Sequence, residues 1–151
     1  MISIIEYESR YQPDFKRLNM EWLEKYGLTE THDLLILDDP EGTIISKGGH
    51  IFLAADEGKV IGTAGIAKEN EEEYEIIKMS VDPAYRGKGI SKLLLDKCLK
   101  AAKEKGAQKV VLFSNSQLQT ALGLYEQYGF RYVPVIDSPM LTADVKMELD
   151  L

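Results

Sequence analysis

The chain has 151 residues, of which 44% are hydrophobic and 28% charged, and its net charge at pH 7 is −7. This length suits one folded domain, so we expect residues 1–151 to form a single domain. The negative charge argues against nucleic acid as the main partner, because phosphate binding requires clustered Lys and Arg side chains. The sequence has no apolar run near the ~20 residues that span a bilayer, no secretion signal and a single cysteine, so we expect a cytoplasmic protein without a membrane partner.

The first half of the chain has both strand and helix patterns. Apolar and polar residues alternate at its start, as in a strand, and apolar residues then recur at helical spacing as far as Gly27, a residue that suits a helix end. The segment Asp56-Glu57-Gly58-Lys59 is typical of a hairpin turn in which Gly58 takes a positive φ. The predicted elements are a strand at 2–7, helices at 12–26 and 31–37, and strands at 50–55, 60–67 and 74–81.

The strand at 74–81 has apolar residues on both faces, which is typical of a central strand. On this strand Glu75 has the same parity as Ile77, Met79 and Val81, so we expect these side chains on one face. The helix that follows has a lysine-rich C-terminal half and ends at Gly106, which suits a helix terminus. The remaining predicted elements are a helix at 89–105, a strand at 109–113, a helix at 118–128 and strands at 131–136 and 144–149.

The turn before the helix at 89–105 has the sequence Arg86-Gly87-Lys88-Gly89-Ile90-Ser91. The first N–H groups of a helix have no intrahelical partners and carry partial positive charge, so they can bind an anion. The two glycines permit positive φ and close approach, and the two basic side chains add charge. The dinucleotide-binding pattern fails, because Lys92 stands at its third glycine. The segment predicts a pyrophosphate site, and a tight turn with basic surface residues is the alternative.

Two blocks of the sequence resemble the GNAT superfamily of acetyl-CoA-dependent N-acetyltransferases. Residues 86–91 resemble its signature Gln/Arg-x-x-Gly-x-Gly/Ala, and residues 121–130 (Ala-Leu-Gly-Leu-Tyr-Glu-Gln-Tyr-Gly-Phe) resemble its Ala-x-x-Leu-Tyr-Glu-x-x-Gly-Phe block. Ser91 departs from the last small position, and Leu118 stands where many members have asparagine, for which Asn115 is the candidate substitute. The resemblance implies an α/β (α+β) fold with a mixed, mostly antiparallel sheet of six to seven strands flanked by about four helices. It also implies transfer of acetyl from acetyl-CoA directly to a primary amine.

The resemblance further implies roles for individual residues. Tyr125 would protonate the departing thiolate, and Glu75 would take the proton of the amine. Packing of an aromatic ring is the alternative for Tyr125, and a solvated strand end is the alternative for Glu75. Backbone N–H groups around Met79 and Val81 would bind the pantetheine arm and polarise the thioester carbonyl. The candidate coenzyme-binding residues are Met79, Ser80, Val81, Arg86, Gly87, Lys88, Gly89, Ile90, Ser91 and Asn115.

Other chemistry is not expected from this sequence. Cys98 falls at a core-facing helical position and is expected to be buried rather than nucleophilic. His32 and His50 have no ligand partners at metal-binding spacing, so no metal is expected. Trp22 is expected in the core, and Tyr26 and His32 are weak candidates for acceptor contacts. The acceptor is expected to be a small-molecule amine rather than a peptide amine, and the protein a monomer or homodimer. A non-catalytic acyl-CoA-binding module is the alternative function.

Overall fold

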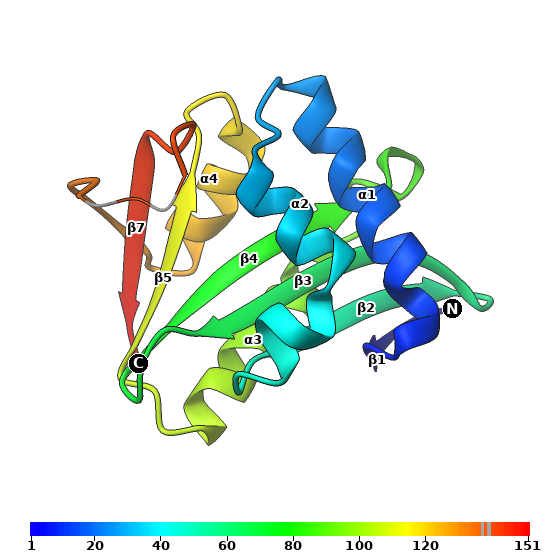
Figure 1. The fold of residues 1–151 in the computed structure, drawn as a ribbon, viewed down its shortest axis with the longest axis horizontal. Helices are drawn as coiled ribbons and strands as arrows, with labels where there is room; N and C mark the ends of the chain where they lie inside the picture. The colour runs from blue at the N-terminus through cyan, green and yellow to red at the C-terminus, as the bar shows by residue number, and fades with distance from the viewer. Residues whose placement is uncertain (137, 139) are drawn as a thin grey trace.

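Figure 1 shows the fold in a computed structural model, which describes residues 1–136, 138 and 140–151. The strands are β1 (Ile2–Glu6), β2 (His50–Asp56), β3 (Lys59–Lys68), β4 (Glu73–Val81), β5 (Lys109–Ser114), β6 (Arg131–Val133) and β7 (Val145–Asp150). The helices are α1 (Gln12–Lys25), α2 (Thr31–Asp38), α3 (Ile90–Glu104) and α4 (Gln119–Gln127), with short turns η1 (Ser9–Tyr11), η2 (Glu41–Ile45) and η3 (Pro83–Tyr85). The sheet order is β1-β2-β3-β4-β5-β7-β6, and only β4 and β5 are parallel neighbours. This confirms the predicted mixed, mostly antiparallel sheet with β4 at its centre.

Helices cover both faces of the sheet (Figure 1). Helices α1 and α2 bury one apolar core against β2, and α3 and α4 bury a second core on the opposite face. Removal of this apolar surface from water is the main stabilising contribution to the fold. Cys98 is fully buried in the second core, as its helical position predicts. None of the helices in the described part of the chain is both long and apolar enough to cross a bilayer.

The strand ends differ from the prediction mainly near the C-terminus. The β2–β3 hairpin has the expected turn, because Glu57 (φ 51°) and Gly58 (φ 82°) both take positive φ as a two-residue type I′ turn requires. The predicted strand at 131–136 is too long, since β6 ends at Val133. The next residue, Pro134, has no N–H to donate to the ladder, so the strand stops there.

A β-bulge in β4 overturns the predicted parity of its side chains. On β3, Thr63 pairs with Ser80 and Gly65 pairs with Ile77, so two residues of β4 oppose one residue of β3. Lys78 occupies the bulge with φ 51°, an uncommon conformation for a residue with a side chain. The expectation that Glu75 shares a face with Met79 and Val81 is therefore wrong. Ile77, two residues after Glu75, packs on the α1–α2 core, whereas Met79 and Val81 pack on the α3–α4 core.

The parallel pairing of β4 with β5 is short. Residues Glu73–Ile76 of β4 pair with Lys109–Leu112 of β5, and the pairing of the two strands ends at Ile76 and Leu112. Beyond it β5 continues beside β7, to which it is paired along its whole length. Figure 1 shows the two strands together near one end and diverging toward the other. The second half of β4 therefore borders a gap in the sheet.

A buried ion pair ties α2 to the bulge of β4. The Nζ of Lys78 donates to Oδ1 of Asp33, and the two side chains are only 6% and 2% exposed. The other oxygen of Asp33 accepts the N–H of Glu30 at 2.9 Å and so caps the first turn of α2. Because both charged groups are buried away from water, removal of either one would leave the other as an unpaired buried charge.

The substitution Asp33→Asn tests this dependence. Asparagine can still accept the capping N–H, but it leaves the ammonium of Lys78 buried without a counter-charge. We expect a loss of about 3 kcal/mol in the free energy of unfolding, measured by urea denaturation. The matched control is Asp38→Asn, which removes the exposed ion pair with Lys16 (2.5 Å) and should cost less than about 1 kcal/mol. Equal losses in the two variants would contradict the importance of the buried pair.

Candidate functional site

A cavity of about 660 Å³ lies at the gap between β4 and β5. Residues from both faces of the sheet line it, including Trp22, Tyr26 and Leu28 on the side of α1 and α2, and Ile90 and Ser91 at the start of α3. The second half of β4, from Glu75 to Val81, forms its wall between the two sides. The divergence of the strands thus creates one space that reaches both faces of the sheet.

The turn before α3 has the geometry of an anion site. Gly87 and Gly89 take φ of 78° and 76°, and a Cβ built at either position would meet no atom within 4 Å. The first α3 hydrogen bond joins Leu93 N to Gly89 O (3.2 Å), so the N–H groups of Ile90 and Ser91 have no partner in the helix. Open space beside unpaired N–H groups at the positive end of a helix fits a pyrophosphate.

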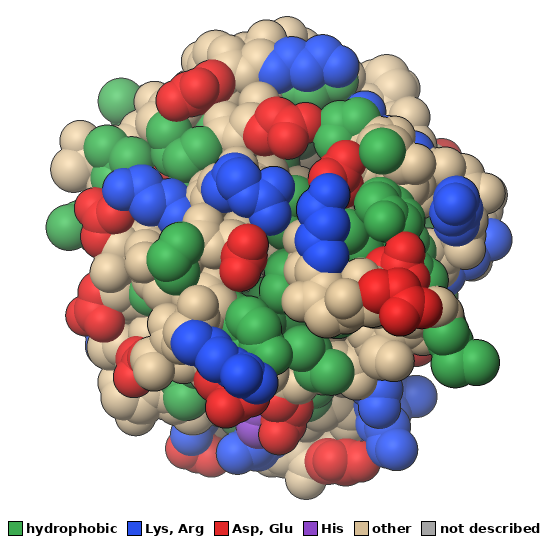
Figure 2. All heavy atoms as spheres, turned by 90° about the vertical axis from the view of Figure 1, so that its right-hand side faces the viewer, with side chains coloured by type: hydrophobic (Ala, Val, Ile, Leu, Met, Phe, Trp, Pro, Cys, Tyr) green, Lys and Arg blue, Asp and Glu red, His purple; other side chains and the backbone are tan. Residues whose placement is uncertain are grey.

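The basic residues of this turn differ in their position. Arg86 lines the cavity, whereas Lys88 is absent from the lining residues and its ammonium lies 5.4 Å from the ring centroid of Tyr85. The hydroxyl of Tyr85 in turn donates to Asp56 at 3.0 Å, which fixes the ring against the β2–β3 hairpin. Over the face shown in Figure 2, basic and acidic side chains are interspersed. The charge that reaches the cavity from this turn comes from Arg86 and from the helix terminus.

The end of β4 presents its backbone to the gap. Met79, Ser80 and Val81 all line the cavity. Ser80 Oγ is directed away from the α3 side, because it donates to the carbonyl of Leu18 in α1 at 2.9 Å. Any contact of this strand with a ligand in the gap would therefore use backbone groups and the side chains of Met79 and Val81.

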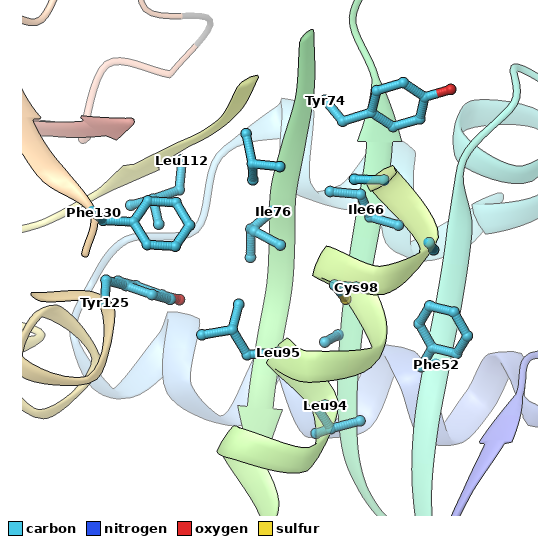
Figure 3. Close-up of a cluster of buried hydrophobic side chains, with 14 of the residues drawn as sticks. Phe52, Ile66, Tyr74, Ile76, Leu94, Leu95, Cys98, Leu112, Tyr125 and Phe130 are labelled. Carbon is cyan, nitrogen blue, oxygen red and sulfur yellow. The ribbon is translucent and has the colours of Figure 1, made fainter. Parts of the chain in front are cut away.

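Tyr125 lies in the core on the α3–α4 side and also lines the cavity. Its ring packs edge-on against Phe130, with centroids 5.7 Å apart, and Figure 3 shows both rings on the side of β4 that Ile76 and Leu95 occupy. Its hydroxyl lies 3.7 Å from Sδ of Met79, a weak acceptor. Burial raises the pKa of this phenol, so the hydroxyl stays protonated at neutral pH and is available as a donor. Sequence reasoning placed this residue correctly at the site, and its role stays a prediction.

Glu75 lines the same cavity and is 7% exposed. Burial raises its pKa to about 8, a hydrogen bond and the charge of Glu69 act in the same direction, and the charge of Lys78 opposes them. The predicted alternative, a solvated strand end, does not fit this burial. A carboxyl group with a pKa near 8 can hold a proton or release it close to neutral pH, which is the property that a general base requires.

Asn115 has its side chain committed within the protein. Its Nδ2 donates to the carbonyl of Thr142 at 2.7 Å, and its Oδ1 accepts the N–H of Gln117 at 3.0 Å. It lines the cavity together with Leu118, so both positions are adjacent to a ligand in the gap. In this geometry Asn115 holds the Thr142 segment in place.

Of the two weak candidates for acceptor contacts, Tyr26 lines the cavity and His32 is exposed on α2. Trp22, expected in the core, also lines the cavity. The sequence reasoning missed Asp33 and Lys78, which also line it. The available signal was weak, because an ion pair between residues 45 positions apart cannot be seen in local spacing. Within the described residues, no group of three or more His, Cys, Asp or Glu side chains is placed to hold a metal ion.

Comparisons with known proteins agree with this geometry. The model of the acetyltransferase (GNAT) family matches residues 7–130. An uncharacterized N-acetyltransferase of Escherichia coli, YjgM, is 32% identical over 128 residues, covering 80% of this chain and 77% of that protein. N-acetylaspartate synthetase of Xenopus tropicalis is 40% identical over 104 residues, covering 67% of this chain and 38% of the synthetase, so the chain spans well under half of that relative.

Solved structures show the same fold. A GNAT-family acetyltransferase from Staphylococcus aureus Mu50 has a TM-score of 0.92 at 24% identity, with 99% of each chain covered. The PaiA N-acetyltransferase of Thermoplasma acidophilum, solved in complex with coenzyme A, has a TM-score of 0.79 at 18% identity, covering 100% of this chain and 99% of that one. The matched family model spans most of the sequence, and the fold agrees with it. The chain therefore belongs to the GNAT acetyltransferase family.

Proposed function

We propose that this protein transfers the acetyl group of acetyl-CoA directly to the primary amine of a small molecule, with both substrates bound at once. The observation that carries the proposal is the single cavity that crosses the sheet through the β4–β5 gap. It meets the helix terminus of α3 on one side and Glu75 on the other. A thioester held from one side could thus meet an amine arriving from the other.

The coenzyme would be held by groups that are free to bind it. The N–H groups at the start of α3 and the side chain of Arg86 would hold the pyrophosphate, and Gly87 and Gly89 would allow its close approach. The backbone of Met79 and Val81 would pair with the pantetheine arm, because this part of β4 has no recorded pairing with β5. Bound acetyl-CoA supplies the thioester, and these residues position it.

Two side chains of this protein would move protons. The amine nitrogen forms a bond to the acetyl carbon as the carbon–sulfur bond breaks, and Glu75 accepts the proton that the nitrogen loses. The hydroxyl of Tyr125 donates its proton to the departing sulfur. The burial of both side chains supports these roles, since neither is solvated by bulk water. Cys98 takes no part, because burial raises the pKa of its thiol and keeps it protonated.

The acceptor side of the cavity favours a small molecule over a protein segment. The aromatic side chains of Trp22 in α1 and of Tyr26, which caps the end of α1, form one wall. The carboxylate of Glu30 accepts hydrogen bonds from the backbone of Leu141 and Thr142 at 2.9 Å each, and so joins the start of α2 to the segment before β7. This bridge limits access from that direction. The N-acetylaspartate synthetase relative, by its name, acetylates an amino acid, which is consistent with a small amine.

The deciding experiment is a thiol-release screen with acetyl-CoA and a broad panel of amino acids, polyamines and other primary amines, beside calorimetric binding of coenzyme A. Transfer to one class of small amine is expected. Binding of coenzyme A without transfer to any amine or peptide would instead favour a non-catalytic acyl-CoA-binding module.

Replacing Gly89 by alanine tests the pyrophosphate site. The new methyl group would enter the open space beside the unpaired N–H groups, so coenzyme A affinity should fall about tenfold or more, measured by calorimetry. Gly106→Ala is the matched control, because Gly106 also has positive φ (83°) and open space but lies at the other end of α3. Both variants should lose similar stability, about 1 kcal/mol, and only Gly89→Ala should bind coenzyme A poorly. Parental affinity in Gly89→Ala would contradict the assignment of the loop.

Replacing Glu75 by glutamine tests the base. With a pKa of about 8, the ionised fraction of Glu75 rises about tenfold per pH unit below that value, so kcat/KM of the parent should rise with pH and level off above about 8. Glu75→Gln lacks this ionisation, and the deficit should grow with pH to roughly 100-fold near pH 8. The measurement is a pH profile from 6 to 9.5 with the best amine of the screen.

Glu73→Gln, two residues earlier on β4 and outside the cavity lining, is the control: it removes a charge that raises the pKa of Glu75, so the inflection should move to lower pH while the plateau of kcat/KM stays at the parental level. Glu75→Gln should also be more stable than the parent at pH 9. A raised carboxyl pKa contributes stability below about 4.5 that is lost as the pH rises through about 8. A parental inflection near pH 8 in Glu75→Gln would assign the base to another group.

Replacing Tyr125 by phenylalanine tests the acid. The ring and its packing on Phe130 persist, but the departing sulfur loses its proton donor in the transition state alone. We expect kcat to fall about 10- to 1000-fold, with acetyl-CoA affinity changed by less than about 1 kcal/mol. Tyr128→Phe on the same helix removes a hydroxyl that donates to Asp96 at 2.7 Å outside the cavity lining, and it should leave kcat unchanged. Weakened binding with normal kcat would make Tyr125 a packing residue.

A further inference from the structure

A chain of buried hydrogen bonds ends on the backbone of the β4 bulge. The indole Nε1 of Trp22 donates to Oδ1 of Asn19 at 3.0 Å, and Nδ2 of Asn19 donates to Oγ1 of Thr63 at 3.0 Å. The hydroxyl of Thr63 donates to the carbonyl oxygen of Lys78 at 2.8 Å. Asn19 and Thr63 are both 0% exposed, so no water competes for these bonds. The chain links α1, β3 and β4.

The direction of every bond in this chain follows from its first member. An indole N–H can only donate, so the side-chain oxygen of Asn19 must face Trp22 and its amide nitrogen must face Thr63. The amide nitrogen also donates to the carbonyl of Phe15 at 2.9 Å, which uses its second hydrogen. Because the Thr63 oxygen accepts from Asn19, its own hydrogen is left for Lys78. The carbonyl of Lys78 is therefore held by a donor that has one orientation.

The anchored carbonyl determines where the next N–H points. The structure contains no cis peptide bond among its described residues, so the N–H of Met79 points opposite to the carbonyl of Lys78. That carbonyl is directed toward the side-chain hydroxyl of Thr63, so the N–H of Met79 points away from this hydroxyl. At this point of β4 the pairing with β5 has already ended, at Ile76. Met79 lines the cavity at this gap.

We propose that the chain Trp22–Asn19–Thr63 is a positioning device that fixes the Lys78–Met79 peptide so that the N–H of Met79 donates to the acetyl carbonyl oxygen. This inference rests on the coenzyme site of the proposed function. Asn19 and Thr63 are outside the cavity lining, and Trp22, which also forms a wall of the acceptor side, acts in this role through the peptide as they do. A donor held in place before the reaction stabilises developing negative charge on that oxygen without reorganising.

The conformation of Lys78 explains why an anchor is needed. Its φ of 51° is unfavourable for a residue with a side chain and persists only where the surroundings hold it. Two buried contacts do so: Thr63 holds the carbonyl, and Asp33 holds the ammonium. Removing the Thr63 hydroxyl leaves the side-chain anchor intact but releases the carbonyl, so the peptide can turn without loss of the ion pair.

Thr63→Val tests the inference, because valine keeps the shape of the side chain and removes the hydroxyl. The probe is acetyl-CoA labelled with carbon-13 at the acetyl carbonyl, and the readout is the infrared stretch of that carbonyl on the protein. On the parent the band should shift to lower wavenumber than in water, since a fixed donor weakens the C=O bond. On Thr63→Val the shift should disappear, while the calorimetric affinity for acetyl-CoA stays within threefold. With the best amine of the screen, kcat should fall at least tenfold and KM should change little.

Two variants serve as controls. Thr63→Ser keeps the hydroxyl and should restore the band shift and kcat. Thr43→Val removes a hydroxyl that donates to the carbonyl of Asp39 at 2.7 Å in η2, away from the cavity, and should change neither. If Thr63→Val does not fold, Trp22→Phe removes the donor that orients the chain, and a reduced band shift is expected there.

An unchanged band shift in the folded Thr63→Val variant, or a parent that binds acetyl-CoA without any shift, overturns the inference. A Thr63→Ser variant that loses the band shift and kcat as Thr63→Val does would also overturn the inference. These results are distinct from a failure of the proposed function. A parent that shifts the band but acetylates no amine, together with loss of the shift in Thr63→Val, refutes the proposed function and supports the positioning chain. A Thr63→Val variant that transfers acetyl at the parental rate refutes the positioning chain alone.

Discussion

Strand β4 is hydrogen-bonded to β5 over only four residues, and the site depends on what this leaves open. Beyond Ile76 one edge of β4 lies inside the sheet, but no strand in the described part of the chain pairs with it, because β5 is paired with β7. Backbone N–H and C=O groups at such an edge require partners, and a bound chain of amides such as pantetheine can supply them. The same divergence makes room for a cavity that connects the two faces of the sheet. In the function that we propose, coenzyme binding, access of the acceptor and the position of the proton-transfer groups all follow from this one interruption.

The β-bulge decides which side chains face which half of the cavity. Without it, Met79 and Val81 would lie on the α1–α2 side with Glu75. With one extra residue in β4, they pack instead on the side of Tyr125, and the hydroxyl of Tyr125 lies near Sδ of Met79. The strand thus separates a helix-terminus side that suits an anion from the side that contains Glu75, where we propose that the acceptor binds. The strained Lys78 at the bulge is held at both its carbonyl and its ammonium by buried partners.

The buried polar groups of this site lower the stability of the folded chain, but burial also gives them properties that are useful for chemistry. Glu75 is a buried carboxyl group, and its pKa near 8 means that ionisation is unfavourable in the folded chain. The Asp33–Lys78 pair is similarly desolvated, and an apolar pair of the same volume would often be as stable. Such arrangements are typical of functional sites, where local stability is given up for a defined geometry. The two apolar cores on either side of the sheet supply the stability that compensates for them.

Local patterns in the sequence determined the order of the elements, the hairpin turn at Glu57–Gly58, the buried face of α3 around Cys98 and the glycine turn before α3. Each of these depends on residues within a few positions of one another, and helical or strand periodicity is sufficient to predict them. The strand at 131–136 was predicted too long because its apolar pattern continues past Pro134, whereas the ladder cannot. Only the tertiary structure decided the face of Met79, the pKa of Glu75 and the pairing of Asp33 with Lys78. A bulge depends on the register of two strands, and desolvation and ion pairing depend on atoms brought together from distant parts of the chain, which no local spacing records.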